Sequence, residues 1–340
     1  MKTISINIVT KNSLKNLIEL YKSINEQDYL KTLIEVLVVD GGSKDKTSEF
    51  CQKNSIRFIE AGYPENQEAR RWIGINNSIN EIVIMLDSDN ILPKKNWITS
   101  MIEPFNNDEN IKAAYTKWYC YSNVLSFYDR YNALMGGNDP IAYLLGKNDR
   151  NELFDNNIKK ESCIIVYKKK NYDVIKFFVN NMPVIGCNGF LARRSYLLRS
   201  KIKNPESFFH TDVHYDLISE NPDIHFAITN NCIIHKTSES LILNLRKRFI
   251  YKLIYSDDDK LASLRRYKIF NIYNKKDFIS LVKVIIFSLL IIPYILSSLI
   301  KIYKTKKIEW IIHPFVIFSF LILYSFSYSV KIINKLKFTK

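Results

Sequence analysis

Short apolar runs alternate with amphipathic stretches over the first ninety residues. Such a rhythm of strands and helices predicts a parallel sheet with crossover helices. The run at 82–86 holds only apolar residues, which is typical of a central strand covered on both faces. The expected strands are 4–9, 35–39, 57–60 and 82–86, and the expected helices are 14–24, 68–79 and one that ends over 48–54.

The pattern weakens over 97–173, a stretch rich in Tyr, Asn and Lys, and it predicts no particular elements there. Regular patterning returns at 184–190 and is followed by a helix-like stretch at 193–200 and a polar cluster at 210–216. We expect this second half to complete a pocket opened by the first. Together they predict an α/β catalytic domain over 1–250.

Two long apolar segments follow the α/β pattern. Segment 284–300 has seventeen residues without a charge and segment 310–330 has twenty-one, whereas a helix needs about 20 to cross a hydrocarbon core. We expect two transmembrane helices over 284–330, preceded by a basic linker at 251–283 and followed by a basic tail at 331–340. Pro293 leaves open a re-entrant first segment, and a buried hairpin in a soluble protein is the other alternative.

The net charge of +15, from 49 Lys and Arg against 34 Asp and Glu, suits nucleic acid, anionic lipid or a phosphorylated substrate. The chain lacks zinc spacings and repeated basic-aromatic platforms, and the excess charge gathers near the apolar segments. We therefore expect membrane and phosphate partners, with no nucleic acid and no obligate protein partner. For a hairpin, the lysines on the catalytic side would be Lys275, Lys276, Lys283, Lys331, Lys335, Lys337 and Lys340, against Lys301, Lys304, Lys306 and Lys307 in the loop.

That bias predicts a multi-pass protein of the cell membrane with a cytoplasmic catalytic domain. The N-terminal apolar run is too short for a signal peptide. The five cysteines include no Cys-x-x-Cys pair, so we expect them to be reduced, as in the cytosol. They are Cys51, Cys120, Cys163, Cys187 and Cys232.

Two carboxylates stand directly beyond the most apolar strand, at Asp87 and Asp89. In open α/β sheets, ligands bind at the carboxyl ends of the strands. Hard divalent cations such as Mg²⁺ and Mn²⁺ bind one or two carboxylates together with phosphate oxygens. The pair therefore predicts a metal site for a diphosphate, although Asp-x-Asp alone often marks a solvated turn.

Polar residues end two other strands. Asp40 precedes Gly41 and Gly42, which permit close backbone approach, so its carboxylate could accept hydrogen bonds from a base or ribose. A capped strand-to-helix turn is the alternative. The end of the first strand supplies Thr10 and Asn12 at the same predicted edge, and three converging polar ends favour a ligand site.

Four segments in this order resemble the family 2 glycosyltransferases. They are Ile-Val-Thr-Lys-Asn at 8–12, Val-Asp-Gly-Gly-Ser-Lys-Asp-Lys-Thr at 39–47, Ala-Arg-Arg-Trp-Ile-Gly at 69–74 and Leu-Asp-Ser-Asp at 86–89. The resemblance is strong over 4–95 and thinner over 184–248. It implies a GT-A fold, with a mixed and mainly parallel sheet, and a nucleotide-sugar donor such as a UDP- or GDP-sugar.

The resemblance also implies roles for individual residues. Asp40 would contact the nucleobase, Asp87 the ribose and Asp89 the metal, and Arg71 matches the arginine that the family carries before the helix glycine. Asn188 and Gly189 match the family's Asn-Gly-Phe segment.

The family's base lies in a Glu-Asp pair that Thr211-Asp212 replaces, so Asp212 becomes the proposed base. His210, His214 and Asp216 are rivals, and a helix-capping role for Asp212 is the alternative. Arg246 and Arg248 match a late basic cluster that holds the diphosphate, or else face lipid headgroups.

We therefore expect an inverting glycosyltransferase that uses Mg²⁺ or Mn²⁺ and a lipid-linked acceptor. The Gln-x-x-Arg-Trp signature of processive members is absent, which favours transfer of a single sugar. A polyprenyl-phosphate glycosyl synthase and a non-catalytic membrane scaffold are the alternatives. A dinucleotide-dependent oxidoreductase would need Gly-x-Gly-x-x-Gly after the first strand, where residues 10–15 contain no glycine.

Overall fold

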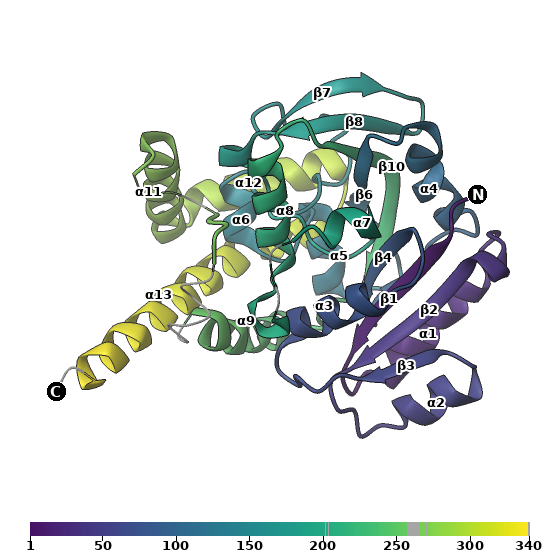
Figure 1. Ribbon diagram of the computed structural model, residues 1–340. Helices are drawn as coiled ribbons and strands as arrows, with labels where there is room; N and C mark the ends of the chain where they lie inside the picture. Colours follow the sequence, from purple (N-terminus) through teal and green to yellow (C-terminus); the bar gives the residue numbers. More distant parts are fainter. Residues whose placement is uncertain (201, 203, 257–264, 270, 272, 339–340) are drawn as a thin grey trace. The chain divides into compact units, whose positions relative to one another are not determined.

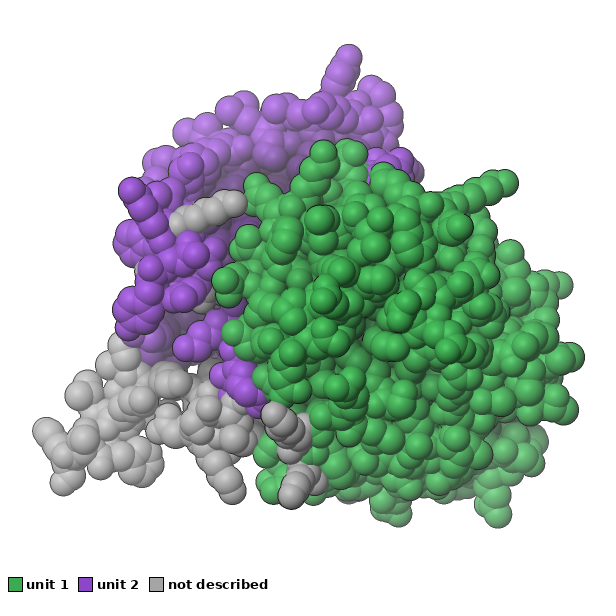
Figure 2. All heavy atoms as spheres, turned by 45° about the horizontal axis from the view of Figure 1, so that its top comes forward, with its two compact units in different colours: residues 1–120, 157–235 green, residues 121–156, 236–340 purple. Residues whose placement is uncertain are grey.

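The computed structural model describes residues 1–200, 202, 204–256, 265–269, 271 and 273–338 (Figure 1). The chain divides into two compact units (Figure 2), of which the first comprises 1–120 and 157–235 and the second 121–156 and 236–340. Parts of the expected linker, 257–264, 270 and 272, lie outside the described residues, as do 339–340 of the expected tail.

The four strands expected from the apolar runs are present in the first unit and pair in parallel, in the order β3-β2-β1-β4. Their bounds are β1 Ile4–Thr10, β2 Ile34–Asp40, β3 Arg57–Glu60 and β4 Ile82–Asp87. The expected helices are present as α1 Leu14–Asn25, α2 Thr47–Lys53 and α3 Gln67–Asn77, with a short 3-10 turn η1 at Lys31–Leu33. This part of the fold is as predicted, because continuous apolar strands and amphipathic helices leave few other arrangements.

The register of the parallel strands brings their polar ends to one edge. Thr10 pairs with Asp40, and Val9 pairs with Asp87. The expected convergence of the three strand ends is therefore confirmed, since parallel strands that start level also end level.

Beyond β4 the sheet becomes mixed and continues in the order β9-β6-β10-β8-β7. β9 runs antiparallel to both β4 and β6, whereas β10 runs parallel to β6 and antiparallel to β8. The bounds are β5 Asn90–Ile91, β6 Ile111–Tyr119, β7 Cys163–Lys168, β8 Tyr172–Phe177, β9 Phe190–Arg193 and β10 His225–His235. The other helices of this unit are α4 Trp97–Asn107, α7 Arg194–Leu197 and α8 His210–Glu220, with 3-10 turns η2 Val179–Asn181 and η3 Pro205–Ser207.

In the first unit, the stretch 97–173, to which the sequence assigned no elements, contains α4, β6, β7 and the start of β8. β6 is a buried strand that carries Lys117, which pairs with Asp173 of β8 at 3.4 Å. This buried ion pair interrupts the apolar run on which strand recognition depends. The helix expected at 193–200 is shorter than predicted, because Arg193 still belongs to β9 and the helix ends at Leu197.

The second unit is helical in its described part. Its core gathers Tyr131, Leu134, Trp310, Val316 and Phe320, all fully buried. The elements are α5 Phe127–Met135, α6 Pro140–Leu144, α9 Leu241–Ser256, α11 Lys275–Leu290, α12 Ile292–Thr305, η4 Ile308–Ile312 and α13 His313–Phe338.

The expected pair of transmembrane helices over 284–330 is not shown. One stretch of the described residues, Ile308–Val330, is long and apolar enough to cross a membrane, but the other segment is broken into α11 and α12, which meet at 88°. Ile291 at the break has a φ of 59°, and Pro293 follows in the first turn of α12. Proline cannot donate the hydrogen bond that would continue α11, which explains the break.

The expectation of five free cysteines is wrong for two of them. Cys120 and Cys232 form a disulfide between the ends of β6 and β10, while Cys51, Cys163 and Cys187 are free and buried. Disulfides are rare in reducing compartments. The cysteine content therefore no longer supports a cytosolic catalytic domain.

Candidate active site

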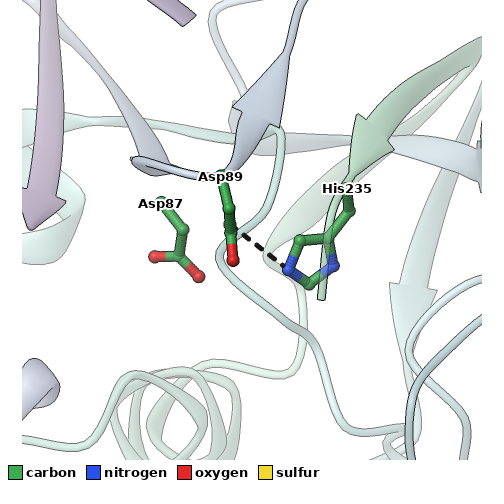
Figure 3. A group of neighbouring side chains, drawn as sticks. All are labelled: Asp87, Asp89 and His235. Atoms are coloured by element: carbon green, nitrogen blue, oxygen red, sulfur yellow. Dashed lines mark ion pairs between the residues drawn. The ribbon is translucent and has the colours of Figure 1, made fainter. Parts of the chain in front are cut away.

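Two carboxylates and an imidazole lie together at the polar edge of the sheet (Figure 3). They belong to Asp87, Asp89 and His235, whose possible ligand atoms all lie within 4.8 Å of one another. Asp89 Oδ1 and His235 Nε2 lie 3.5 Å apart. Two carboxylate oxygens and one imidazole nitrogen form a suitable donor set for Mn²⁺ or Mg²⁺, with open positions left for phosphate oxygens.

A short strand pairing brings His235 to the two aspartates. Asp87 ends β4 and Asp89 lies in the turn before β5, which pairs antiparallel with the end of β10. His235 lies opposite Asn90 in that pairing. Trp97, fully buried, secures the same strand end by donating from Nε1 to the Cys232 carbonyl at 2.8 Å.

Asp87 is held by two side chains from α3. Arg71 donates from its guanidinium to Asp87 Oδ1 at 2.6 Å, and Gln67 Nε2 donates to the same oxygen at 2.7 Å. Neighbouring Arg70 points elsewhere and donates to the Tyr63 carbonyl at 2.6 Å. Arg71 is thus the arginine that reaches the predicted metal site.

A chain of buried charges links this site to α8. Glu68 accepts from Arg71 Nε at 3.2 Å through one carboxylate oxygen, and its other oxygen accepts from the His210 backbone N–H at 3.1 Å. His210 Nδ1 lies 2.7 Å from that second oxygen. Because His210 opens α8, Glu68 fixes the start of the helix that carries Asp212.

The pKa values of this chain favour charged forms. Burial raises the pKa of Glu68, but His210 and Arg71 outweigh burial and bring it to about 2. Burial lowers the pKa of His210, but its contacts with Cys187 and Glu68 raise it to about 10. The pKa of His214 falls to about 3, because of burial and then of the charge on His210. At neutral pH, His210 is therefore protonated and His214 is neutral.

Asp40 organises the loop after β2. Its Oδ2 accepts from the backbone N–H groups of Gly42 at 2.8 Å and Ser43 at 2.6 Å. Gly42 has a φ of +85°, which favours glycine there. The Asp40 carboxylate thus holds the loop in shape at the predicted nucleotide edge.

Thr10 and Asn12 extend that edge. Asn12 Oδ1 accepts from the Lys44 N–H at 2.8 Å, and the Asn12 N–H donates to Ser43 Oγ at 2.7 Å. Within the described part of the chain, Thr10 Oγ1 is buried without a hydrogen-bond partner. A buried hydroxyl of this kind fits a site that completes its hydrogen bonds with a ligand.

Asn188 and Gly189 lie immediately before β9. Gly189 has a φ of +67°, and an added Cβ would come within 3.3 Å of the Ile233 side chain. A larger residue would therefore strain the turn and press on β10 two residues before His235. Asn188 is itself buried.

Asp212 lies in the first turn of α8, two residues after His210, and is 1% exposed. Of its expected rivals, His214 is equally buried and packs with Phe190, ring centroids 4.7 Å apart. His210 is engaged with Glu68. The structure places Asp212 on the helix that Glu68 ties to α3.

Arg246 and Arg248 lie on α9, in the second unit. Arg246 is exposed, whereas Arg248 is partly buried and donates to Asn138 Oδ1. Burial lowers the pKa of Arg248, but Asp139 and nearby tyrosines raise it above its ordinary value. Arg248 therefore has partners within its own unit.

The geometry agrees with the comparison to known sequences. Residues 5–176, just over half the chain, match the model of Glycosyl transferase family 2. The chain belongs to this family. Its mixed sheet, in which most strands run in the same direction, matches the GT-A fold that the resemblance implied.

One curated relative of this chain is the Glycosyltransferase AglE of Haloferax volcanii, 32% identical over 100 residues. The match covers 28% of this chain and 33% of AglE, so the chain spans about a third of that relative's length.

Similar solved structures include the mannosyltransferase PcManGT from Pyrobaculum calidifontis in complex with GDP-Man and Mn²⁺, at 13% identity, TM-score 0.48, with 93% of this chain and 87% of that chain covered. S. aureus TarS 1-349 in complex with UDP is similar at 16% identity and TM-score 0.46, with 94% and 91% covered. The glucosyl-3-phosphoglycerate synthase from Mycobacterium tuberculosis in complex with Mn²⁺ and UDP-glucose is similar at 17% identity and TM-score 0.44, with 75% and 78% covered.

Sequence reasoning gives no role to two residues of this candidate site, His235 and Glu68. His235 directly follows the apolar run 232–234, as Asp87 follows 82–86. Glu68 is only the first residue of the helix expected at 68–79. A polar residue directly after an apolar run is the signal that could have pointed to His235.

Proposed function

We propose that this chain is an inverting glycosyltransferase that transfers a single sugar from a UDP- or GDP-sugar to a lipid-linked acceptor. The observation that carries the donor half of the proposal is the convergence of Asp87, Asp89 and His235 within 4.8 Å. A bound Mn²⁺ or Mg²⁺ there would neutralise the diphosphate leaving group. PcManGT and the glucosyl-3-phosphoglycerate synthase, which were solved with Mn²⁺ and nucleotide-sugars, are consistent with such a donor.

The roles of the nucleotide-binding residues follow from their places at the sheet edge. Asp40 holds the loop that faces the nucleobase, while Thr10 and Asn12 supply hydrogen-bonding groups beside it. Asp87 and Asp89 are the metal ligands, to which we add His235, and Arg71 orients Asp87. The remaining proposed donor contacts are Asn188, Gly189, Arg246 and Arg248.

Asp212 is the proposed base. The acceptor hydroxyl oxygen attacks the anomeric carbon on the face opposite the nucleotide. Its proton passes to the Asp212 carboxylate, while the bond to the diphosphate breaks with its electron pair. Glu68 and His210 hold the start of α8 so that the carboxylate keeps its place.

The acceptor half of the proposal depends on the second unit. Its candidate membrane helix and the exposed apolar side chains of α12 support a location at the cell membrane. The bias of the flanking lysines supports the cytoplasmic side for the catalytic domain, residues 1–250, whereas the Cys120–Cys232 disulfide adds no support for that side. A polyprenyl-linked acceptor in surface glycan or glycoprotein assembly would be presented there. The absence of Gln-x-x-Arg-Trp from the sequence supports single transfer.

The test is nucleotide release by the purified protein in detergent, with a panel of UDP-, GDP- and dTDP-sugars, Mn²⁺ or Mg²⁺, and membrane lipid extract. We expect metal-dependent release of one nucleotide and its loss in Asp89→Ala. Asp212→Asn should bind the donor but transfer nothing. If Asp212→Asn keeps full transfer while Asp89→Ala is inactive, the acceptor is a phosphate and the enzyme is a polyprenyl-phosphate glycosyl synthase. Donor binding without turnover would favour the scaffold.

A further inference from the structure

The break between α11 and α12 sets how deeply these helices can enter a bilayer. At 1.5 Å per residue, the apolar stretch 284–290 of α11 is about 10 Å long and 292–300 of α12 about 13 Å. The hydrocarbon core is about 30 Å thick. The two stretches turn by 88° relative to each other. Each can enter one leaflet, but the bent pair is too short to cross.

The break between α11 and α12 carries apolar side chains, and the apolar stretches of the two helices have lysines at their outer ends. Leu290 and Ile292, on either side of the break, are 56% and 63% exposed. A group of large apolar side chains that are exposed to solvent indicates a surface that binds a partner or a membrane. Lysines flank the apolar stretches at both ends, with Lys283 before and Lys304 after. In this arrangement the bend between α11 and α12 would lie among the acyl chains, while the lysines at the outer ends of the two helices would lie at anionic headgroups.

Contacts in the second unit place the exit of α12 beside segment 121–156. Lys301 Nζ lies 2.6 Å from both Glu152 carboxylate oxygens. Glu309, just beyond α12, accepts from Arg130 Nε at 2.6 Å and from Tyr121 Oη at 2.7 Å.

Segment 121–156 is joined at its two ends to residues 120 and 157 of the first unit, which contains the sheet, and it has no apolar run long enough to cross. It therefore remains on the side of the membrane where the sheet lies. The exit of α12 remains there with it.

The contacts of α13 also place it on the side of the membrane where segment 121–156 lies. It begins at His313, whose Nδ1 lies 2.7 Å from Tyr131 Oη of segment 121–156. Eleven residues later, about 16 Å along the helix, Tyr324 Oη donates to Asp139 Oδ2 at 2.5 Å, and Lys252 Nζ lies 4.4 Å from the centre of its ring. If α13 crossed the bilayer from His313, Asp139 and Lys252 would lie near the midplane, where charged groups are costly.

We infer that this chain is held on one face of an anionic bilayer, with α11 and α12 inserted into one leaflet as a bent wedge and α13 lying along the same face without crossing. The inference rests on the membrane location proposed above. It replaces the expected two crossings by attachment from a single side, so a lipid-linked acceptor would be met at the headgroup level of that leaflet.

The test uses full-length protein in sealed vesicles of phosphatidylglycerol and a neutral lipid. Three proteins are labelled with a membrane-impermeant maleimide: Lys53→Cys on exposed α2, Lys304→Cys at the end of α12, and a form with one cysteine appended after Lys340. The parent protein corrects for native thiols. We expect all three to be labelled to the same fraction before detergent is added. Labelling of Lys304→Cys or of the appended cysteine only from the side opposite Lys53→Cys would overturn the inference.

Flotation of the vesicles with bound protein tests the proposed membrane location separately from the single-face attachment. We expect Leu290→Glu to weaken binding at least about tenfold. Leu30→Glu, at a leucine in the first unit that is also 56% exposed, should not. A parent protein that does not float would refute the membrane location itself. A protein that floats but exposes Lys304→Cys on the far side would refute only the single-face attachment.

Discussion

Arg71 donates to Asp87 at 2.6 Å and to Glu68 at 3.2 Å, so one buried guanidinium connects the predicted metal site with the start of α8. The forked, planar guanidinium can serve two carboxylates at once, which a lysine ammonium does with poorer geometry. Glu68 in turn contacts His210, which begins the helix that carries Asp212. The donor side and the acceptor side of the proposed reaction are therefore coupled through Arg71, Glu68 and His210.

The first prediction concerns that coupling. Arg71→Lys keeps the positive charge but loses the fork, so Asp87 is oriented less well and Mn²⁺ affinity should fall about 10-fold. Electron paramagnetic resonance titration of free Mn²⁺ measures this directly. Arg57→Lys, at an arginine on β3, is the matched control and should bind Mn²⁺ as the wild type does. Equal affinity in Arg71→Lys would refute the role of the fork.

His235 is predicted to be the third metal ligand. His235→Ala should weaken Mn²⁺ binding at least about 10-fold, because one of three protein ligands is lost. His225 begins the same strand ten residues earlier and serves as the matched control. His225→Ala should leave Mn²⁺ binding unchanged. If both variants bind Mn²⁺ alike, His235 does not ligate the metal.

Glu68 is predicted to position α8 through His210. In Glu68→Gln the imidazole keeps Cys187 but loses its carboxylate partner while it stays buried, so the pKa of His210 should fall from about 10. NMR titration of the histidine ring protons measures this shift, and kcat should fall about tenfold with little change in donor affinity. Glu49→Gln, at an exposed glutamate of α2, should change neither quantity. An unchanged His210 titration would contradict the proposed contact.

The free energy of unfolding should fall in mild acid because His214 is buried as a neutral imidazole. Its pKa is about 3 in the folded protein against an ordinary value of 6.5, so the unfolded chain gains a proton first as the pH falls. The stability that neutral His214 contributes is present above pH 6.5 and is lost progressively toward pH 3. His210 has a raised pKa, so its contribution is fully present below pH 6.5 and does not change in this window. Thermal unfolding between pH 7 and 5 should show a falling Tm, with a clearly smaller fall in His214→Phe; identical slopes would contradict this assignment.

The parallel half of the fold could be predicted from local pattern alone. Segment 82–86 contains only apolar residues, and a strand buried on both faces is the simplest structure for it. The polar residues after such strands, Asp40 and Asp87, meet at one edge because parallel strands share a direction. Sequence reasoning therefore found the pair of strand-end aspartates and the edge where they lie without any knowledge of distant contacts.

The mixed half resisted prediction because its strands depend on partners far along the chain. β9 pairs with both β4 and β6, although it contains only four residues. Lys117 in β6 is compensated by Asp173, 56 residues away. Neither relationship leaves a local signal, since short strands and buried ion pairs both weaken the apolar pattern.

By itself, the sequence determined the class of the protein, the strand ends that carry Asp40, Asp87 and Asp89, and the presence of two apolar segments near the C-terminus. These are properties of composition and of spacing along the chain. Only the tertiary structure decided that His235 joins the aspartates, that Glu68 ties Arg71 to His210, that Cys120 pairs with Cys232 and that the first apolar segment is broken at Ile291. The physical reason is that each of the first three depends on a contact between residues more than 100 positions apart, and the fourth is a backbone turn that apolar composition does not reveal.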